Sequence, residues 1–189
     1  MRLSEMLLSE DEQIKSRRVF LALWPDENVR QQLVNALRLM PQSALQGVVF
    51  RPENLHLTLH FIGRITQQSF DCVHRVASEI QLPAFDLNLN RYDFFERAGV
   101  FWIGPDIIPQ ALIQLHNDLG QALINCGYKA QSRQFTPHVT LMRKLKQPVN
   151  MPAKLSESVN WRINQFALLE SIAGKGGVAY IPRALYPLA

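Results

Sequence analysis

The sequence predicts an α+β fold built from two similar lobes whose antiparallel sheets face a central cleft. Strand-like and helix-like segments alternate along the chain, and one strand–helix–strand unit occurs twice. The two copies keep a nearly constant separation. Phe20 recurs as Phe101 after 81 residues, and His56 recurs as His138 after 82 residues. We therefore expect a pseudo-symmetric internal duplication.

Composition indicates one globular domain over residues 17–189, preceded by a polar N-terminal extension over residues 1–16 that is partly helical or disordered. Hydrophobic residues make up 47% of the chain and charged residues 19%, which is typical of a soluble globular protein. The net charge of +4 favours anionic partners without identifying one. Cys72 and Cys126 show neither disulfide-framework nor zinc-motif spacing, so we expect no disulfide framework in a cytoplasmic protein. We expect neither a secretory signal nor a membrane helix, because no sufficiently long apolar run is present.

The first unit begins with an apolar run over residues 19–24, which predicts a buried strand closed by Pro25. Asp26 suits the N-cap of a helix that Pro41 ends. The other elements expected in this half are a strand, a helix and a strand, over residues 55–62, 67–80 and 85–95.

The second unit restarts with residues 100–105, which resemble the first apolar run and its closing proline. A helix with leucines on one face is expected next, over residues 109–126. Three further strands are expected, over residues 135–141, 166–171 and 180–185.

Two short motifs carry the chemistry: His56-Leu57-Thr58-Leu59 and His138-Val139-Thr140-Leu141. Residues two apart on a strand share a face, so the histidine and threonine of each motif project together. The duplication would bring two imidazoles and two hydroxyls into one cleft.

This set suits metal-independent hydrolysis of a phosphodiester. Histidine titrates near neutral pH, so one ring can take a proton from water and the other can give a proton to the leaving oxygen. Threonine hydroxyls can donate hydrogen bonds to the phosphate oxygens. Zinc is the rival hypothesis, but His56 and His60 have no third ligand at a characteristic spacing.

The segments 54–63 and 135–143 resemble the two signatures of the two-histidine (2H) phosphoesterase superfamily. Within it, the chain is most similar to the RNA 2′,3′-cyclic phosphodiesterases, also called 2′-5′ RNA ligases, over about residues 17–188. The resemblance implies the bilobal fold and conversion of an RNA or nucleoside 2′,3′-cyclic phosphate to a 2′-phosphate without a cofactor. It also implies a reverse 2′-5′ ligation.

The resemblance further implies the roles of the four motif residues. His56 would be the general acid toward the leaving 3′ oxygen, and His138 the general base on water. Thr58 and Thr140 would hold the phosphate. Because the motifs are pseudo-symmetric, the residues alone leave open which histidine is the acid.

Substrate binding is expected at a basic stretch around the second motif. Residues 119–156 contain six basic and no acidic side chains, a field that would attract RNA. Arg143 and Arg133 are the candidate phosphate ligands, although strict alternation directs Arg143 away from His138. Phe20 is a candidate for base stacking. We expect RNA ends or cyclic nucleotides as partners, no membrane, no metal, and a monomer.

Three interpretations stay open. The chain could act on another nucleotide, such as ADP-ribose cyclic phosphate or 2′-5′ oligoadenylate, or it could be a non-catalytic RNA-binding module. By strict alternation His60 shares the face of Thr58, where it either lines the cleft floor or is an ordinary satisfied polar residue. His74 and His116 are expected on helix surfaces.

Overall fold

The computed structural model describes residues 16–39, 47–129, 134–147, 154–175 and 177–189. Three features expected from the sequence lie outside these ranges: residues 1–15 of the N-terminal extension, the proline at position 41 and the candidate ligand Arg133. Ser16, the last residue of the expected extension, is described.

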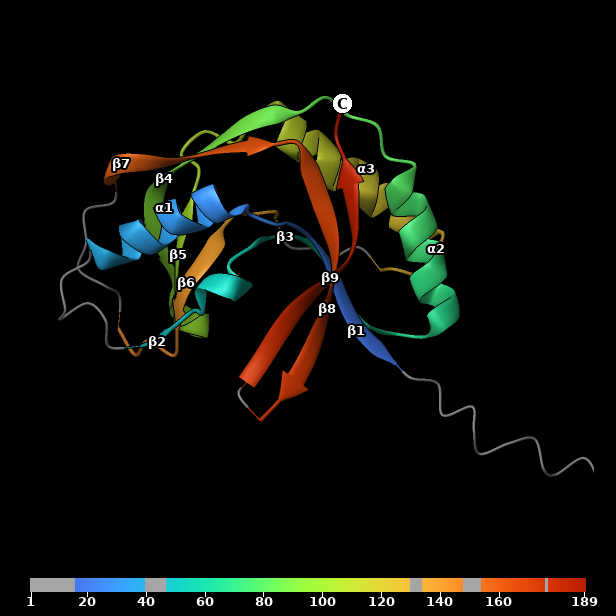
Figure 1. Cartoon of the computed structure of the whole chain (residues 1–189), viewed down its shortest axis with the longest axis horizontal. Coiled ribbons are helices and arrows are strands. Elements are labelled where there is room, and N and C mark those ends of the chain that lie inside the picture. The colour runs from blue at the N-terminus through green and yellow to red at the C-terminus, as the bar shows by residue number, and fades with distance from the viewer. Residues whose placement is uncertain (1–15, 40–46, 130–133, 148–153, 176) are drawn as a thin grey trace, which may run out of the picture.

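Within the described residues, nine strands form one antiparallel sheet with the order β7-β4-β5-β6-β3-β1-β8-β9, and β2 pairs with β6 (Figure 1). The strands β3 and β6 share a single residue pair, Leu57 with Val139, which divides the sheet into two halves. This arrangement confirms the expected two-lobed α+β fold. The strand bounds are β1 Arg17–Leu23, β2 Val48–Val49, β3 Leu57–Ile65, β4 Phe85–Phe95, β5 Val100–Gly104, β6 Val139–Arg143, β7 Lys154–Ile163, β8 Gln165–Gly174 and β9 Gly177–Pro187.

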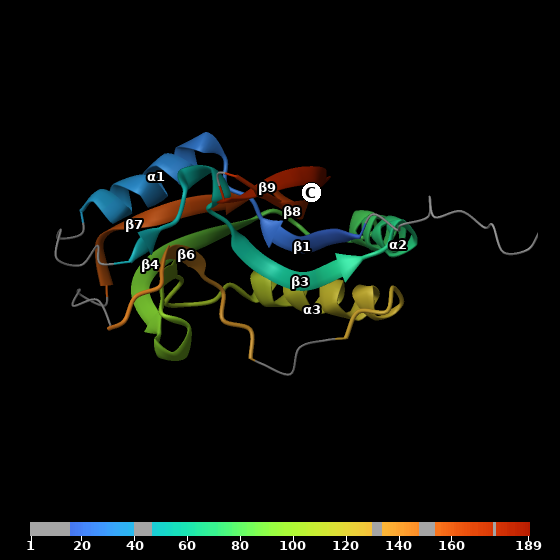
Figure 2. The same cartoon turned by 90° about the horizontal axis from the view of Figure 1, so that it is seen from below.

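The three α-helices of the described chain are α1 Glu27–Arg38, α2 Gln67–Ser78 and α3 Gln110–Ile124. The helix of each repeated unit crosses to the other half: α1 follows β1 but packs on β7, and α3 follows β5 but packs on β3 and α2 (Figures 1 and 2). Asp26 caps α1 as expected, because its Oδ1 accepts the N–H of Val29 at 2.8 Å. The two halves therefore share one hydrophobic core.

The surface of the sheet that faces away from this core carries the motif histidines and threonines, and we call it the site face. Phe20 lies there, with its ring centroid 4.9 Å from that of His56. Phe101 instead lies in the main core, where it stacks on Tyr92 at 5.3 Å. The expected correspondence of Phe20 with Phe101 is therefore wrong, because the two side chains point to opposite faces.

A β-bulge follows the threonine of the first motif. Thr58 pairs with Ala22 and His60 pairs with the adjacent Leu21, so Leu59 is an extra residue. A bulge reverses the facing of the residues after it. His60 therefore points toward α3 and not to the face of Thr58. Gly120 on α3 makes room for it, since a Cβ there would lie 3.1 Å from Cε1 of His60.

The second motif has a bulge at the equivalent place. Thr140 pairs with Trp102 and Met142 pairs with the adjacent Phe101, so Leu141 is the extra residue. The buried Met142 takes the direction that His60 takes in the first motif. Arg143 consequently emerges on the site face, which strict alternation did not predict.

Other elements differ from expectation at their ends. The strand expected over residues 135–141 begins only at Val139, because Pro137 has no N–H to donate to a ladder. The strand expected to stop at Gly63 continues to Ile65, and Gly63 takes a φ of 94° beside a second register shift. The strand β7 was not expected from the sequence.

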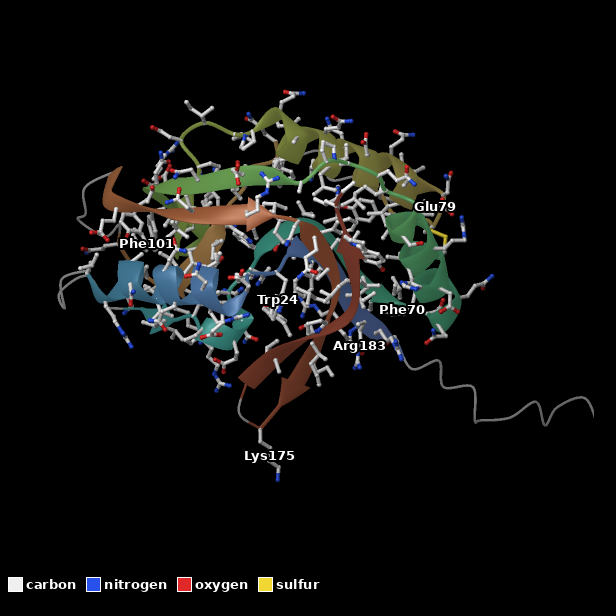
Figure 3. All side chains as sticks on the ribbon, turned by 45° about the horizontal axis from the view of Figure 1, so that its top comes forward. Trp24, Phe70, Glu79, Phe101, Lys175 and Arg183 are labelled. Carbon is white, nitrogen blue, oxygen red and sulfur yellow. A yellow bond between two sulfur atoms is a disulfide. The ribbon has the colours of Figure 1, made fainter. Side chains whose placement is uncertain are left out.

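Cys72 on α2 and Cys126 just after α3 form a disulfide, with their Cα atoms 5.7 Å apart (Figure 3). No disulfide framework was expected from the sequence, and this single disulfide was not anticipated. The pair could not be recognised from the sequence, because the cysteines are 54 positions apart and only the packing of α2 against α3 brings them together. Among the described residues, no helix combines the length and apolar composition that crossing a bilayer would need.

Candidate active site

His56 immediately precedes β3 and is held at both ring nitrogens. Its Nδ1 lies 2.7 Å from the carbonyl oxygen of Asn54, and its Nε2 lies 3.0 Å from Oγ1 of Thr58. A carbonyl only accepts hydrogen bonds, so Nδ1 carries the proton. In the neutral ring Nε2 is then the acceptor, and the Thr58 hydroxyl donates to it. The first motif therefore presents one proton-accepting nitrogen beside one hydroxyl.

His138 immediately precedes β6 and is held in the same way. Its Nδ1 donates to the carbonyl oxygen of Thr136 at 2.7 Å, again two residues upstream. The neutral ring therefore has the same tautomer as His56, with Nε2 as the acceptor. Two imidazoles with matched proton positions thus lie on the site face.

Aromatic side chains surround both rings. The His56 ring lies 4.9 Å from Phe20 and 5.0 Å from Tyr180, while the His138 ring lies 5.0 Å from Phe95 and 5.7 Å from Trp102. His56 is 9% exposed and His138 is half-buried. Tight ring contacts limit rotation of each imidazole, so the backbone carbonyls can fix its direction.

Burial dominates the electrostatics of both histidines. Burial lowers the pKa of His56 to about 4; the Asn54 carbonyl opposes this, and the charges of Arg143 and His138 add to it. Burial also lowers the pKa of His138, against the hydrogen bond to the Thr136 carbonyl. Both rings are therefore neutral at pH 7 in the ligand-free protein.

Arg143 lies on the His56 side of the site. Its guanidinium carbon is 4.3 Å from the centroid of the Phe50 ring, which in turn lies 6.3 Å from the His56 ring. The side chain is exposed, and its charge acts on His56. The bulge at Leu141 thus brings a cation to the edge of the candidate site.

Asn54 is a site residue that sequence reasoning did not single out. Its Nδ2 donates to the carbonyl oxygen of Val178 at 2.7 Å, and its Oδ1 accepts the N–H of Tyr180 at 3.1 Å. Asn54 is buried, and its own carbonyl holds His56. It therefore ties the first motif to β9. An asparagine two residues before the histidine was visible in the sequence, but its partners lie more than 120 residues away.

The other predicted site residues differ in whether the structure describes them. Phe20 lies against His56, and Thr58 and Thr140 lie on the site face, whereas Arg133 is outside the described residues. His60 is a satisfied buried residue, and its Nε2 donates to the carbonyl of His116 at 2.7 Å. His116 is stacked between two rings, so its expected place on a helix surface is wrong.

The zinc hypothesis depends on His56 and His60 as paired histidine ligands at short spacing. In the described part of the chain, no group of three or more His, Cys, Asp or Glu side chains is arranged to hold a metal ion. The functional groups that the site face brings together are two imidazoles, two hydroxyls and a nearby guanidinium.

Comparison with known proteins identifies the class. The family model of the 2′-5′ RNA ligase superfamily matches residues 24–175, so the chain belongs to this superfamily of 2H phosphoesterases. The RNA 2′,3′-cyclic phosphodiesterase of Escherichia coli (strain K12) is 30% identical over 170 residues, covering 88% of this chain and 93% of the relative. The enzyme of the same name from Thermotoga maritima is 24% identical over 173 residues, covering 86% and 91%.

Solved structures agree with this assignment. The crystal structure of a phosphoesterase has a TM-score of 0.86 at 27% identity, covering 93% of this chain and 99% of that one. Escherichia coli LigT in its apo form has a TM-score of 0.83 at 28% identity, covering 92% and 98%. LigT complexed with 3′-AMP also has a TM-score of 0.83 at 28% identity, covering 93% and 99%.

Proposed function

We propose that this protein hydrolyses the 2′,3′-cyclic phosphate of RNA ends or nucleosides to a 2′-phosphate, without a metal, and that it can run the reverse 2′-5′ ligation. The single observation that carries the proposal is the matched pair of imidazoles. His56 and His138 each donate Nδ1–H to a carbonyl two residues upstream, which reserves both Nε2 atoms for proton transfer. Membership of the superfamily and the relatives' names support the substrate class.

In the proposed reaction, water attacks phosphorus and the bond from phosphorus to the 3′ oxygen breaks. Nε2 of His138 takes the water proton, and protonated Nε2 of His56 gives a proton to the 3′ oxygen. Acid action by His56 requires that its pKa rise from about 4 when substrate binds. An anionic phosphate beside the ring favours the protonated form and acts in that direction.

The hydroxyls and the cation would stabilise the phosphate. Thr58, which faces Nε2 of His56 at 3.0 Å, would turn its hydroxyl to a non-bridging oxygen once that nitrogen is protonated. Thr140 occupies the equivalent place in the second motif and would do the same. Arg143 would add positive charge at the His56 side, where charge on phosphate develops.

The test is to incubate the purified protein, in excess EDTA, with the four nucleoside 2′,3′-cyclic phosphates and to separate 2′- from 3′-phosphate products. We expect 2′-phosphate from the wild-type protein. His56→Ala and His138→Ala should each lower kcat by about 100- to 10,000-fold, the usual contribution of a general acid or base. Circular dichroism should show that both variants are folded.

His74→Ala is the matched control, because His74 is an exposed histidine on α2 whose partner is the hydroxyl of Tyr186. It should keep normal turnover. Near-normal turnover in either motif variant, or a 3′-phosphate product, would contradict the proposal. Salt-dependent RNA binding without any turnover would favour a binding module instead. ADP-ribose cyclic phosphate and 2′-5′ oligoadenylate belong in the same substrate panel.

A further inference from the structure

A pocket of about 890 Å³ opens beside β3 and begins at Thr58 and His138, one residue from each motif. It exists because β3 and β6 pair only at Leu57 and Val139. Beyond this pair α3 lies along β3 (Figure 2). Side chains of α3 line the pocket. The volume is within the range of about 300–1,000 Å³ that is typical of small-molecule sites. A group attached to a phosphate between the motifs would reach this space directly.

Phenylalanine side chains form the walls of the pocket. Phe61 comes from β3, Phe95 from the end of β4, and Phe135 from the segment before β6. Phe61 is 40% exposed because the bulge at Leu59 turns it to the site face, and the guanidinium carbon of Arg18 lies 5.1 Å from its centroid. A large aromatic ring that stays exposed beside reactive groups is suited to stacking on a ligand.

A pair of stacked histidine rings also lines the pocket. The rings of His60 and His116 are 4.2 Å apart and nearly parallel, and His116 stacks on Phe135 at 3.9 Å. His60 Nε2 donates to the carbonyl of His116, and its Nδ1 accepts from the hydroxyl of Tyr128 at 3.3 Å. Burial lowers the pKa of both histidines, so this pair is uncharged at neutral pH.

The charge of the pocket differs from that of the His56 side. Among the described residues that line it, the charged side chains are Glu96 and Arg97, which have opposite signs. Exposed amides lie around the opening, at Asn117, Gln121 and Gln134. An aromatic pocket whose two charged side chains have opposite signs, and which offers amide donors and acceptors, matches an unstacked nucleobase, which proteins recognise by stacking and by hydrogen bonds to its edges. It does not match a phosphate.

We propose that this pocket binds the nucleobase of the nucleoside attached to the reacting phosphate, with Phe61 as a stacking surface and Gln121 as a reader of the base edge. The inference rests on the proposed function, because it takes the phosphate to lie between the two motifs. It makes the pocket a determinant of specificity. Substrates that carry a base should have a higher kcat/KM than substrates without one, and this increase should differ among the four bases.

The test compares two phenylalanines that each lie under an arginine. Phe61 lies in the pocket under Arg18. Phe70 lies on α2 (Figure 3), under Arg17 at 4.6 Å, and is not among the residues that line the pocket. The substrates are adenosine 2′,3′-cyclic phosphate and methyl β-D-ribofuranoside 2,3-cyclic phosphate, which has no base. The readout is the ratio of their kcat/KM values.

We expect the wild-type protein and Phe70→Ala to prefer the nucleoside, and Phe61→Ala to lower that preference by about tenfold, the effect of losing one base–aromatic stack. Gln121→Ala, an exposed helix position, should change the order of preference among the four nucleosides. An unchanged ratio in Phe61→Ala together with an unchanged base order in Gln121→Ala would overturn the inference. A loss of the same size in Phe70→Ala would also overturn it.

Failure of the proposed function gives a different result. If the wild-type protein turns over neither substrate, the reaction is wrong, and the pocket is tested by equilibrium binding of adenosine 3′-monophosphate against inorganic phosphate. The nucleotide should bind more tightly than phosphate, and Phe61→Ala should remove about tenfold of that advantage. Equal binding of both ligands by the wild-type protein would overturn the inference.

Discussion

The surroundings of His56 and His138 differ in most respects other than the carbonyl that holds each ring. His56 is 9% exposed, donates to the carbonyl oxygen of Asn54 and lies near the charge of Arg143. His138 is half-buried and lies at the mouth of a pocket that carries little net charge. The first motif is thus enclosed and cationic, and the second is more open and apolar.

Under the proposed reaction, this difference would give each copy of the duplicated unit its own proton-transfer role. Duplication keeps the tautomer, the threonine and the bulge in both motifs, so each copy can transfer a proton at Nε2. An acid and a base that work at the same pH need unlike environments, and those come from residues outside the motifs. Asn54 and Arg143 form the environment on the His56 side, and Phe95 and Trp102 form the environment on the His138 side.

The largest expected effect separates the acid from the base. In a substrate whose bridging 3′ oxygen is replaced by sulfur, the leaving thiolate needs no proton, because thiols are far more acidic than alcohols. His56→Ala should lose about 100- to 10,000-fold in kcat on the oxygen substrate and recover most of it on the sulfur substrate. His138→Ala should stay slow on both.

These kcat values are measured by single-turnover kinetics with the two substrates side by side. The opposite pattern, with rescue of His138→Ala alone, would exchange the two roles. Equal loss on both substrates in both variants would contradict any division of labour between the motifs.

A smaller effect is expected on stability as a function of pH. The folded pKa of His56 is about 4, below the unfolded value of about 6.5, so the unfolded chain binds more protons between these pH values. Stability should therefore fall as the pH drops from about 6.5 toward 4, by up to about 3 kcal/mol from this group. Urea unfolding at pH 7 and pH 4.5 measures it.

The variant His56→Gln cannot titrate and should flatten this dependence. His138→Gln is the matched comparison from the more open side, and it should flatten the dependence less. If His138→Gln removed the larger part of the pH dependence of stability, the enclosed surroundings of His56 would not control its protonation.

The smallest effect concerns the hydrogen bonds that join the Asn54 side chain to β9, which we call the Asn54 clamp. Asn54→Ala leaves the Val178 carbonyl and the Tyr180 N–H without their amide partner, which should cost about 1–3 kcal/mol of unfolding free energy. It should also move the pKa of His56, measured by NMR, and leave that of His138 unchanged. Asn90→Ala is the control, because Asn90 accepts the N–H of Asp106 far from β9. An unchanged His56 pKa would show that the clamp is structural only.

The alternation of side chains predicted most strands but failed at the bulges. The strand over residues 85–95 was predicted with the observed bounds, because Phe85, Leu87 and Leu89 alternate with exposed polar residues. A bulge leaves no such mark in the sequence, since Leu59 and Leu141 are ordinary apolar strand residues. The sheet face to which His60 and Arg143 point could therefore not be predicted from strict alternation along the strand.

The candidate site divides in the same way. Its four motif residues could be named because their pattern is local and repeated. Asn54, Phe61 and His116 could not, since their partners belong to other elements: β9, β1 and β3. The strand β7 was missed although Val159, Trp161 and Ile163 alternate with exposed Asn160 and Arg162.

The disulfide has a consequence for cleavage of the chain. The chain between Cys72 and Cys126 contains β4, β5 and all of α3, and it includes the exposed turn at Glu96–Ala98. A protease that cuts this turn opens a ring and does not release a fragment. The nicked chain would migrate as one species on a non-reducing gel and as two on a reducing gel. The two motifs would then belong to different peptides that one covalent bond keeps together.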